Sequence, residues 1–119
     1  MNEEQNQSSG RIEVAPEVLT TIARLTAIRV DGISRLVSAP AEVGHLFRRS
    51  TRQEGVVLHW SDDSLSFDIY VVMEPNVSLV ETSRNLQRAI IEAIDTMVGI
   101  PVTAVNVHVE DVVFAQEQS

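Results

Sequence analysis

Two short apolar runs on either side of the tetrapeptide SDDS constrain the fold more than any other part of the sequence. Residues 55–60, GVVLHW, and residues 65–73, LSFDIYVVM, show the period of two that is typical of β-strands. If Asp62 and Asp63 form a two-residue turn, every pair that meets on one side of the resulting hairpin is apolar. These pairs are Trp60–Leu65, Leu58–Phe67 and Val56–Ile69. A longer loop with the same register parity is the alternative, and either loop predicts an antiparallel hairpin.

Two other segments have apolar positions at helical spacing. In residues 15–30, Pro16 suits the first helical turn and Asp31-Gly32 ends the helix. In residues 78–99, one face is apolar and the other is charged, and Gly99 and Pro101 end the helix. The positions predicted to give a buried face in the first helix are Leu19, Ile22, Ala23, Thr26 and Val30. The residues that line the apolar face of the second helix are Leu79, Leu86, Ile90, Ala93, Ile94 and Met97.

The remaining elements complete an α+β fold. We predict strands at residues 11–14, 33–39 and 102–114, and a short helix or turn at residues 41–53. The predicted order is β-α-β-(short α)-β-β-α-β, a two-layer sandwich with a mixed sheet and both main helices on one face. Residues 11–114 form a single domain, after a disordered N-terminal arm at residues 1–10 and before a short polar tail at residues 115–119.

The composition excludes several classes of chemistry. All nine basic residues are arginine and there is no cysteine, which excludes Schiff-base lysines, a phosphate-loop lysine and thiolate catalysis. A net charge of -8 and an aromatic content of 4% argue against general nucleic-acid binding. The polar, acidic N-terminus does not resemble a secretory signal, and no apolar run has the length of a membrane span, so we expect a cytoplasmic protein without a cofactor.

The last predicted strand contains AVNVHVED, in which His108 and Glu110 share a face. A metal site needs three or four protein ligands, and only two other histidines are available, so we expect a polar outer strand face and no metal site. With the hairpin, this strand predicts an open sheet face that serves as a protein contact or lies in water. The candidate interaction residues on it are His59, Asp68, Tyr70, Asn106, His108 and Glu110.

A second candidate surface is a basic patch in the segment HLFRRSTR. His45, Arg48, Arg49 and Arg52 follow helical spacing and would share one face of a helix. Such a face could meet an acidic partner, the acidic surface of another copy or anionic lipid headgroups, or it could simply be solvated. Nucleic-acid binding through Arg48, Arg49 and Arg52 is the alternative function.

The sequence also resembles the alkaline shock protein family of bacterial envelope-stress proteins. The resemblance covers about residues 10–113 and lies in the opening GRIEVAPEVL, the helix end VDGI, the GV of the hairpin and above all VNVHVEDV. It implies a non-enzymatic cytoplasmic scaffold without catalytic residues, which acts in cell-envelope homeostasis and stress. It also implies that the protein associates with itself and docks to a small membrane-anchored partner, which would hold it at the inner face of the membrane.

Overall fold

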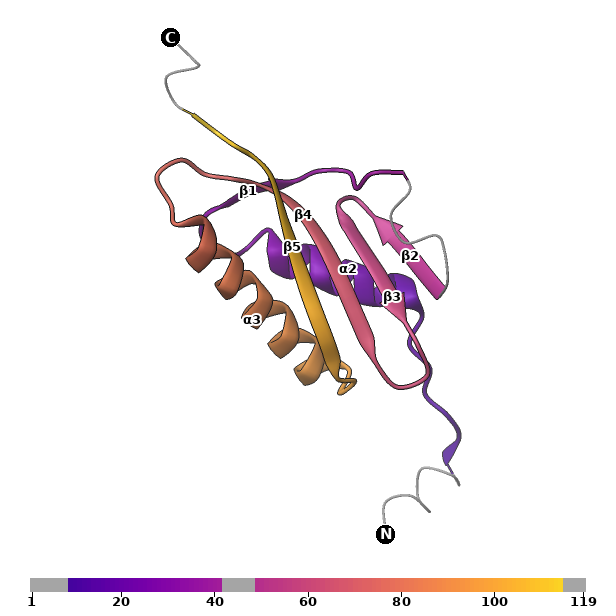
Figure 1. The fold of residues 1–119 in the computed structure, drawn as a ribbon. Helices are drawn as coiled ribbons and strands as arrows, with labels where there is room; N and C mark the ends of the chain where they lie inside the picture. Colours follow the sequence, from indigo (N-terminus) through magenta and orange to yellow (C-terminus); the bar gives the residue numbers. More distant parts are fainter. Residues whose placement is uncertain (1–8, 42–48, 115–119) are drawn as a thin grey trace.

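The computed structural model describes residues 9–41 and 49–114 as one α+β domain (Figure 1). Two helices and five strands follow one another in the order α-β-β-β-β-α-β. Their bounds are α2 Pro16–Ala27, β1 Ile33–Leu36, β2 Arg49–Gln53, β3 Val56–Trp60, β4 Leu65–Met73, α3 Leu79–Met97 and β5 Val102–Val112.

The sheet is mixed and is organised around β4. β5 pairs parallel to β4 over its whole length, while β3 and β1 pair antiparallel to successive parts of it, and β2 lies beyond β3. β3 and β1 therefore share one edge of β4 and β5 occupies the other. Tyr70 marks the change of neighbour, because its N–H donates to the Gly55 carbonyl and its carbonyl accepts from Val37 N–H, each at 2.9 Å.

This junction requires a glycine at position 55. A Cβ atom on Gly55 would lie 2.6 Å from the Val37 carbonyl oxygen, closer than real Cβ contacts come. Gly55 has a φ of 86° and Glu54 a φ of 43°, the two left-handed conformations that a two-residue β-hairpin turn demands. The turn therefore joins β2 to β3 and leaves room for β1 to reach β4.

The predicted hairpin register is confirmed. Trp60 pairs with Leu65, and the alternation continues to Val56 opposite Ile69. The turn closes with Ser61 N–H donating to the Ser64 carbonyl at 3.1 Å, so the two-residue turn at Asp62-Asp63 is correct. Because side chains alternate strictly across a strand, this register puts the three pairs in which both partners are apolar on one side of the hairpin.

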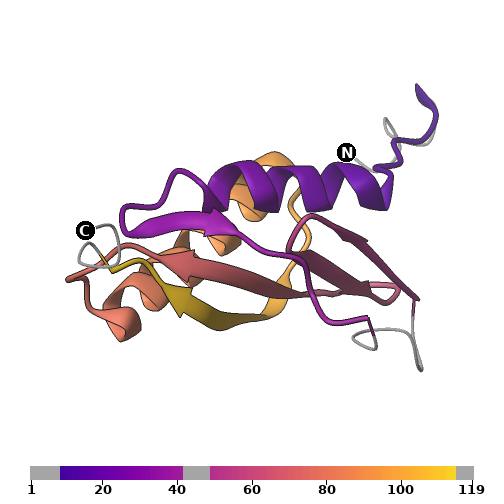
Figure 2. The same ribbon diagram turned by 90° about the horizontal axis from the view of Figure 1, so that it is seen from above.

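Both helices pack on that apolar side of the sheet. Figure 2 shows α2 lying along one side of the strands, and residues of α3 join the same core cluster. The core side chains include Leu86, Ile90 and Ile94 from α3, Leu19 and Ile22 from α2, and Val56, Leu58, Phe67, Ile69, Val71 and Met73 from the sheet. The predicted two-layer arrangement is therefore correct.

Two local predictions are wrong. Residues 11–14 form no strand, and Ile12 in this segment is 93% exposed, because alternation alone does not provide a neighbouring strand to pair with. Residues 49–53 form the strand β2 and not a helix, because the tight turn at Glu54-Gly55 folds them back along β3. The predicted order consequently loses its first strand, and a strand replaces part of the predicted short helix. Residues 1–8 of the predicted arm and all of the predicted tail lie outside the described residues.

Candidate interaction face

Three strands bring a carboxylate and two imidazoles together on the sheet face opposite the helices. Asp68 on β4 accepts from His59 Nε2 of β3 at 3.1 Å through Oδ2, and from His108 Nε2 of β5 at 2.8 Å through Oδ1. Each imidazole donates through Nε2, because a carboxylate oxygen accepts hydrogen bonds. The side chain of Asp68 is 15% exposed and that of His108 is 38% exposed. The hydrogen bonds within the site therefore hold its side chains in place, and solvent can still reach His108.

Tyr70 completes this group, which we name the Asp68 cluster: His59, Asp68, Tyr70 and His108. Tyr70 and His108 are direct partners across the parallel β4–β5 pair. Their rings stack with centroids 4.3 Å apart and planes 8° from parallel. The stack fixes the orientation of the imidazole that bonds to Asp68, so the cluster presents one defined arrangement of polar atoms.

The electrostatic surroundings of the cluster keep Tyr70 neutral. Burial raises the pKa of the Tyr70 phenol above its ordinary value of 10.0, and the negative charges of Asp68 and Glu110 raise this pKa further. Arg52 acts in the opposite direction. The phenol therefore keeps its proton at neutral pH and serves as a hydrogen-bonding ring without charge.

His59 is the more enclosed of the two histidines. Its Nδ1 atom is buried and has no hydrogen-bond partner in the part of the chain that the structure describes. A buried polar atom without a partner carries a free-energy cost. The hydrogen bond to Asp68 therefore decides the orientation of this ring, and the cluster depends on the carboxylate.

The other two predicted residues of this face lie at the rim of the cluster. Asn106 is exposed and is the register partner of Asp68. Glu110 is exposed and falls where the β4–β5 register shifts, since Val109 pairs with Val71 and Asp111 pairs with Val72. Five of the six residues share this face by register, while an irregularity in β5 sets Glu110 apart from the regular pairing, and their role as contact residues stays a prediction.

The predicted basic patch does not form as a helical face. Arg49 and Arg52 stand three residues apart on the strand β2, so their side chains leave opposite faces of the sheet. Arg49 donates to Asp62 at 3.0 Å, and Arg52 donates to the Ala39 carbonyl at 3.5 Å. His45 and Arg48 lie outside the described residues.

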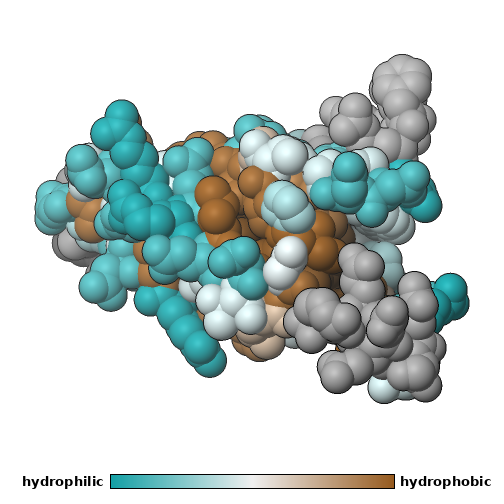
Figure 3. All heavy atoms as spheres, turned by 90° about the horizontal axis from the view of Figure 1, so that it is seen from below, coloured by the Kyte–Doolittle hydropathy of each residue, from teal (hydrophilic) through white to brown (hydrophobic). Residues whose placement is uncertain are grey.

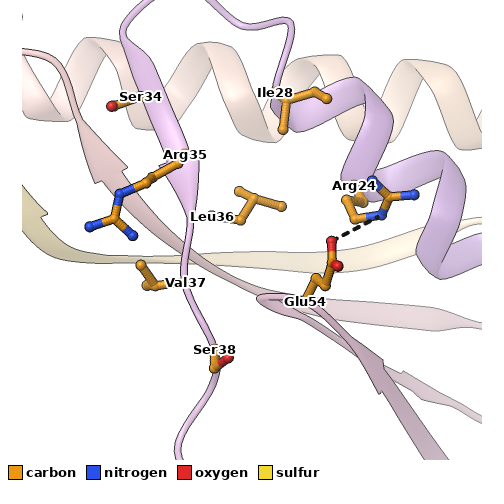
Figure 4. Close-up of a pocket in the computed structure, with 8 residues that line it drawn as sticks. All are labelled: Arg24, Ile28, Ser34, Arg35, Leu36, Val37, Ser38 and Glu54. Atoms are coloured by element: carbon orange, nitrogen blue, oxygen red, sulfur yellow. Dashed lines mark ion pairs between the residues drawn. The ribbon is translucent and has the colours of Figure 1, made fainter.

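Two cavities lined by described residues lie away from the Asp68 cluster. One of about 260 Å³ opens between α2, β1 and the β2–β3 turn, and Figure 4 shows its eight lining residues. Arg24 and Glu54 point toward each other across it, with Nε and Oε1 3.9 Å apart, while Arg35 points away. The inward-facing guanidinium of this cavity is therefore already paired with a carboxylate.

A second cavity of about 660 Å³ lies at the end of the molecule where α2 begins and the β3–β4 hairpin turns, and its lining includes Leu19, Trp60, Leu65 and Ile100. Figure 3 shows that this end carries a broad hydrophobic area. Among the residues that the structure describes, no three His, Asp or Glu side chains are placed to hold a metal ion. The Asp68 cluster remains the most organised polar group on the described surface.

Comparison with known proteins shows to which family this chain belongs. The model of the alkaline shock protein 23 family, described as having a cell envelope-related function, matches residues 4–114. The chain belongs to this family. The resemblance drawn from VNVHVEDV is thereby confirmed, and this motif is the part of β5 that supplies His108 to the cluster.

The relatives are bacterial. The protein Spy1535 of Streptococcus pyogenes is 31% identical over 105 residues, which cover 87% of this chain and 80% of that protein. YqhY of Bacillus subtilis is 28% identical over 106 residues, which cover 88% of this chain and 78% of that protein. A solved MamM CTD structure aligns with a TM-score of 0.46 at 14% identity over 80% of this chain and 95% of that chain.

Sequence reasoning found the residues of the cluster but missed their bonding. Strand parity alone places His59, Asp68 and His108 on one face. It does not show that Asp68 lies between the two imidazoles, because His108 comes 40 residues later and its register follows from the path of α3. A lone aspartate within the apolar run FDIYVV is the signal that could have indicated a bonded carboxylate.

Proposed function

We propose that this protein is a non-enzymatic scaffold of the cell envelope, which associates with itself and docks to a small membrane-anchored partner. The observation that carries the proposal is the Asp68 cluster, an ordered and partly exposed polar group on an open sheet face. The cluster contains two imidazoles hydrogen-bonded to one carboxylate, and its partly exposed imidazole, His108, is available to contact a partner protein.

The composition of the open face supports a protein contact. Val57, Tyr70 and Val72 are buried beneath this face, and the side chains that it exposes are those of His108, Asn106 and Glu110. A partner on this face would meet an imidazole, an amide and a carboxylate, which are polar groups of the kind found at the rim of protein interfaces. The family's cell envelope-related function supplies the setting. No described helix has the length and apolar character to cross a membrane, so in this proposal the anchor comes from the partner.

Capture from native membranes tests the docking. The full chain is immobilised, incubated with detergent-solubilised membranes of its host, and the retained proteins that contain a membrane-spanning segment are identified. Asp68→Asn and His108→Ala should each abolish the capture of such a protein, because each removes a hydrogen bond that orders the cluster. Asp95→Asn, at an exposed position on α3, is the matched control and should capture it as the wild type does.

Light scattering over a concentration series tests the self-association. The proposal predicts that the average mass rises with concentration. A chain that stays monomeric at the highest concentration and also captures no membrane-anchored protein contradicts the proposal in both parts.

Nucleic-acid binding has no comparable support. The two described arginines of the basic patch are bonded within the chain and leave opposite faces of β2. The overall charge of -8 opposes a polyanion.

A further inference from the structure

His108 and His59 bond to the same carboxylate but differ in the surroundings of their second ring nitrogen. Each donates through Nε2 to Asp68, at 2.8 Å for His108 and 3.1 Å for His59. Nδ1 of His59 is buried and has no hydrogen-bond partner among the described residues. Nδ1 of His108 is not buried, and the side chain of His108 is 38% exposed against 14% for His59. Nδ1 of His108 is therefore the second nitrogen that another molecule can reach.

The bond to Asp68 fixes the tautomer of the neutral His108 ring. A carboxylate oxygen accepts, so Nε2 carries the ring proton when it bonds to Asp68. A neutral imidazole has one donor nitrogen and one acceptor nitrogen, which makes Nδ1 the acceptor. The stack on Tyr70, with ring planes 8° from parallel, holds the plane of the imidazole. The neutral cluster therefore presents one lone pair toward solvent in a fixed direction.

The surroundings of this lone pair are rich in acceptors and in negative charge. Asn106 and Glu110 on the same strand are exposed, and an ionised carboxylate such as that of Glu110 has only acceptors. Arg52 on β2 acts as a nearby positive charge, through its influence on Tyr70. The chain as a whole carries a net charge of -8. Such a face is complementary to a partner that brings positively charged hydrogen-bond donors.

We infer that a Lys or Arg side chain of the membrane-anchored partner donates to Nδ1 of His108, and that docking therefore requires the neutral imidazole. This inference rests on the proposed function and specifies the chemistry of its partner. The segments that flank membrane spans on the cytoplasmic side carry an excess of Lys and Arg. A small membrane-anchored partner accordingly supplies a basic side chain close to its anchor.

Protonation of His108 reverses the role of Nδ1. An imidazolium has donors on both nitrogens, so Nδ1 no longer accepts, and its positive charge repels a basic side chain. The charged and titratable groups around this ring, among the described residues, are Asp68 and Tyr70 on β4, His59 on β3, Arg52 on β2 and Glu110 on β5. Acidification should therefore release the partner, while Nε2 keeps its bond to Asp68.

Capture over a pH series tests the requirement for a neutral ring. The immobilised full chain is incubated with detergent-solubilised host membranes between about pH 5 and pH 8, the range in which histidine titrates, and the retained membrane-spanning protein is quantified. One pH unit below the titration midpoint about a tenth of the imidazoles are neutral, so capture should fall about tenfold there. Constant capture over this range overturns the inference, while the proposed docking stands. If the wild type captures no such protein at any pH, both fail.

His108→Gln separates the outward nitrogen from the order of the cluster. The glutamine amide supplies a donor for Asp68 in place of Nε2, but it has no counterpart of Nδ1 and does not titrate. Capture at about pH 7.5 should fall at least about tenfold, and the remainder should not depend on pH. Glu92→Gln, at an exposed position on α3, is the matched control and should keep both the capture and its pH dependence. If His108→Gln captures as the wild type does, Nδ1 is not the contact, even where His108→Ala abolishes capture.

His59→Gln shows which imidazole carries the pH dependence. Because Nδ1 of His59 is buried, the pH dependence of capture should remain in this variant. A pH dependence that disappears in His59→Gln and persists in His108→Gln overturns the assignment to His108. Circular dichroism checks that both variants fold.

The captured protein itself tests the basic side chain. Peptides of its soluble segment next to the membrane span, each with one Lys or Arg replaced by glutamine, are titrated into the wild type and into His108→Gln by calorimetry. One replacement should weaken binding to the wild type about tenfold and leave binding to His108→Gln unchanged, because both changes remove the same hydrogen bond. If no replacement gives this result, the donor is not a basic side chain and the inference is overturned.

Nitrogen NMR of the imidazole tests the tautomer without any partner, because protonated and unprotonated ring nitrogens differ in chemical shift. At about pH 7.5, His108 should carry a proton on Nε2 and none on Nδ1, and Nδ1 should gain its proton as the pH falls. The midpoint of this titration should coincide with the midpoint of the loss of capture. A proton on Nδ1 of His108 at the higher pH overturns the inference and leaves the proposed docking in place.

Discussion

The two faces of the sheet come from the same strands but are held together by different forces. On the helix side, Leu58, Phe67 and Ile69 are completely buried in apolar contacts. On the open side, Asp68 and its neighbours are joined by hydrogen bonds and ring stacking. Apolar packing scales with buried area and has no direction, whereas hydrogen bonds require fixed geometry. The helix side therefore supplies stability, and the open side supplies a surface of defined shape.

The largest expected effect lies on the helix side. Phe67→Ala removes a side chain with no exposed surface and should lower the free energy of unfolding by about 3–5 kcal/mol. Urea unfolding followed by circular dichroism measures the change. Ile91→Ala on the exposed side of α3 is the control and should cost less than about 1 kcal/mol. A loss of only that size for Phe67→Ala would mean that the helix side does not dominate stability.

The open side should give a smaller loss with a different cause. Asp68→Asn keeps the shape but replaces one acceptor oxygen by an amide donor. One imidazole must then present an unprotonated Nε2, and for His59 this would place a proton on the buried, unpartnered Nδ1. The expected cost is about 1–2 kcal/mol in the free energy of unfolding. Asp95→Asn on α3 should change it by less than about 0.5 kcal/mol, and equal effects of the two changes would show that the cluster is not held by Asp68.

The sequence predicts the parts of the fold that depend on apolar alternation between nearby residues, and it does not predict the parts that depend on pairing with another strand. The register of the hairpin is predictable because its partners are at most 13 residues apart and the apolar alternation allows one solution. Residues 49–53 escaped prediction because their strand exists only through the Glu54-Gly55 turn and pairing with β3. Residues 11–14 were predicted as a strand from their alternating pattern, but they form none, because no neighbouring strand provides backbone hydrogen bonds for them.

The candidate site was predictable in its members but not in its bonds. The parity of β3, β4 and β5 places the six residues on one face. The contact between Asp68 and His108 depends on the register of β5 along β4, and the register shift between Leu65 and Ser66 changes that register before His108 is reached. A sequence pattern contains no measure of such shifts.

Tyr70 offers a pH test of the open side alone. Its raised pKa means that the folded state keeps the phenol proton when the unfolded chain has lost it. Stability from this group is complete below about pH 10 and is lost as the pH rises through the folded pKa. The chain has one tyrosine, no lysine and no cysteine, so no other side chain titrates in this window.

Urea unfolding at a series of alkaline pH values measures this loss. Tyr70→Phe removes the titrating group and should make the free energy of unfolding flat over the same range. An equally steep alkaline loss in the phenylalanine variant would show that the dependence does not come from Tyr70.

The smallest effect should come from the rim of the cluster. Glu110→Gln removes an exposed charge and should change the free energy of unfolding by less than about 0.5 kcal/mol. It should nevertheless lower the pKa of Tyr70, because the Glu110 charge contributes to raising it. The decrease should be smaller than that caused by Asp68→Asn, since Asp68 has the larger influence on Tyr70. The ultraviolet absorbance of tyrosinate measures both decreases, and Glu92→Gln on α3 should leave the pKa unchanged. If Glu110→Gln lowers this pKa more than Asp68→Asn does, Asp68 is not the electrostatic centre of the open face.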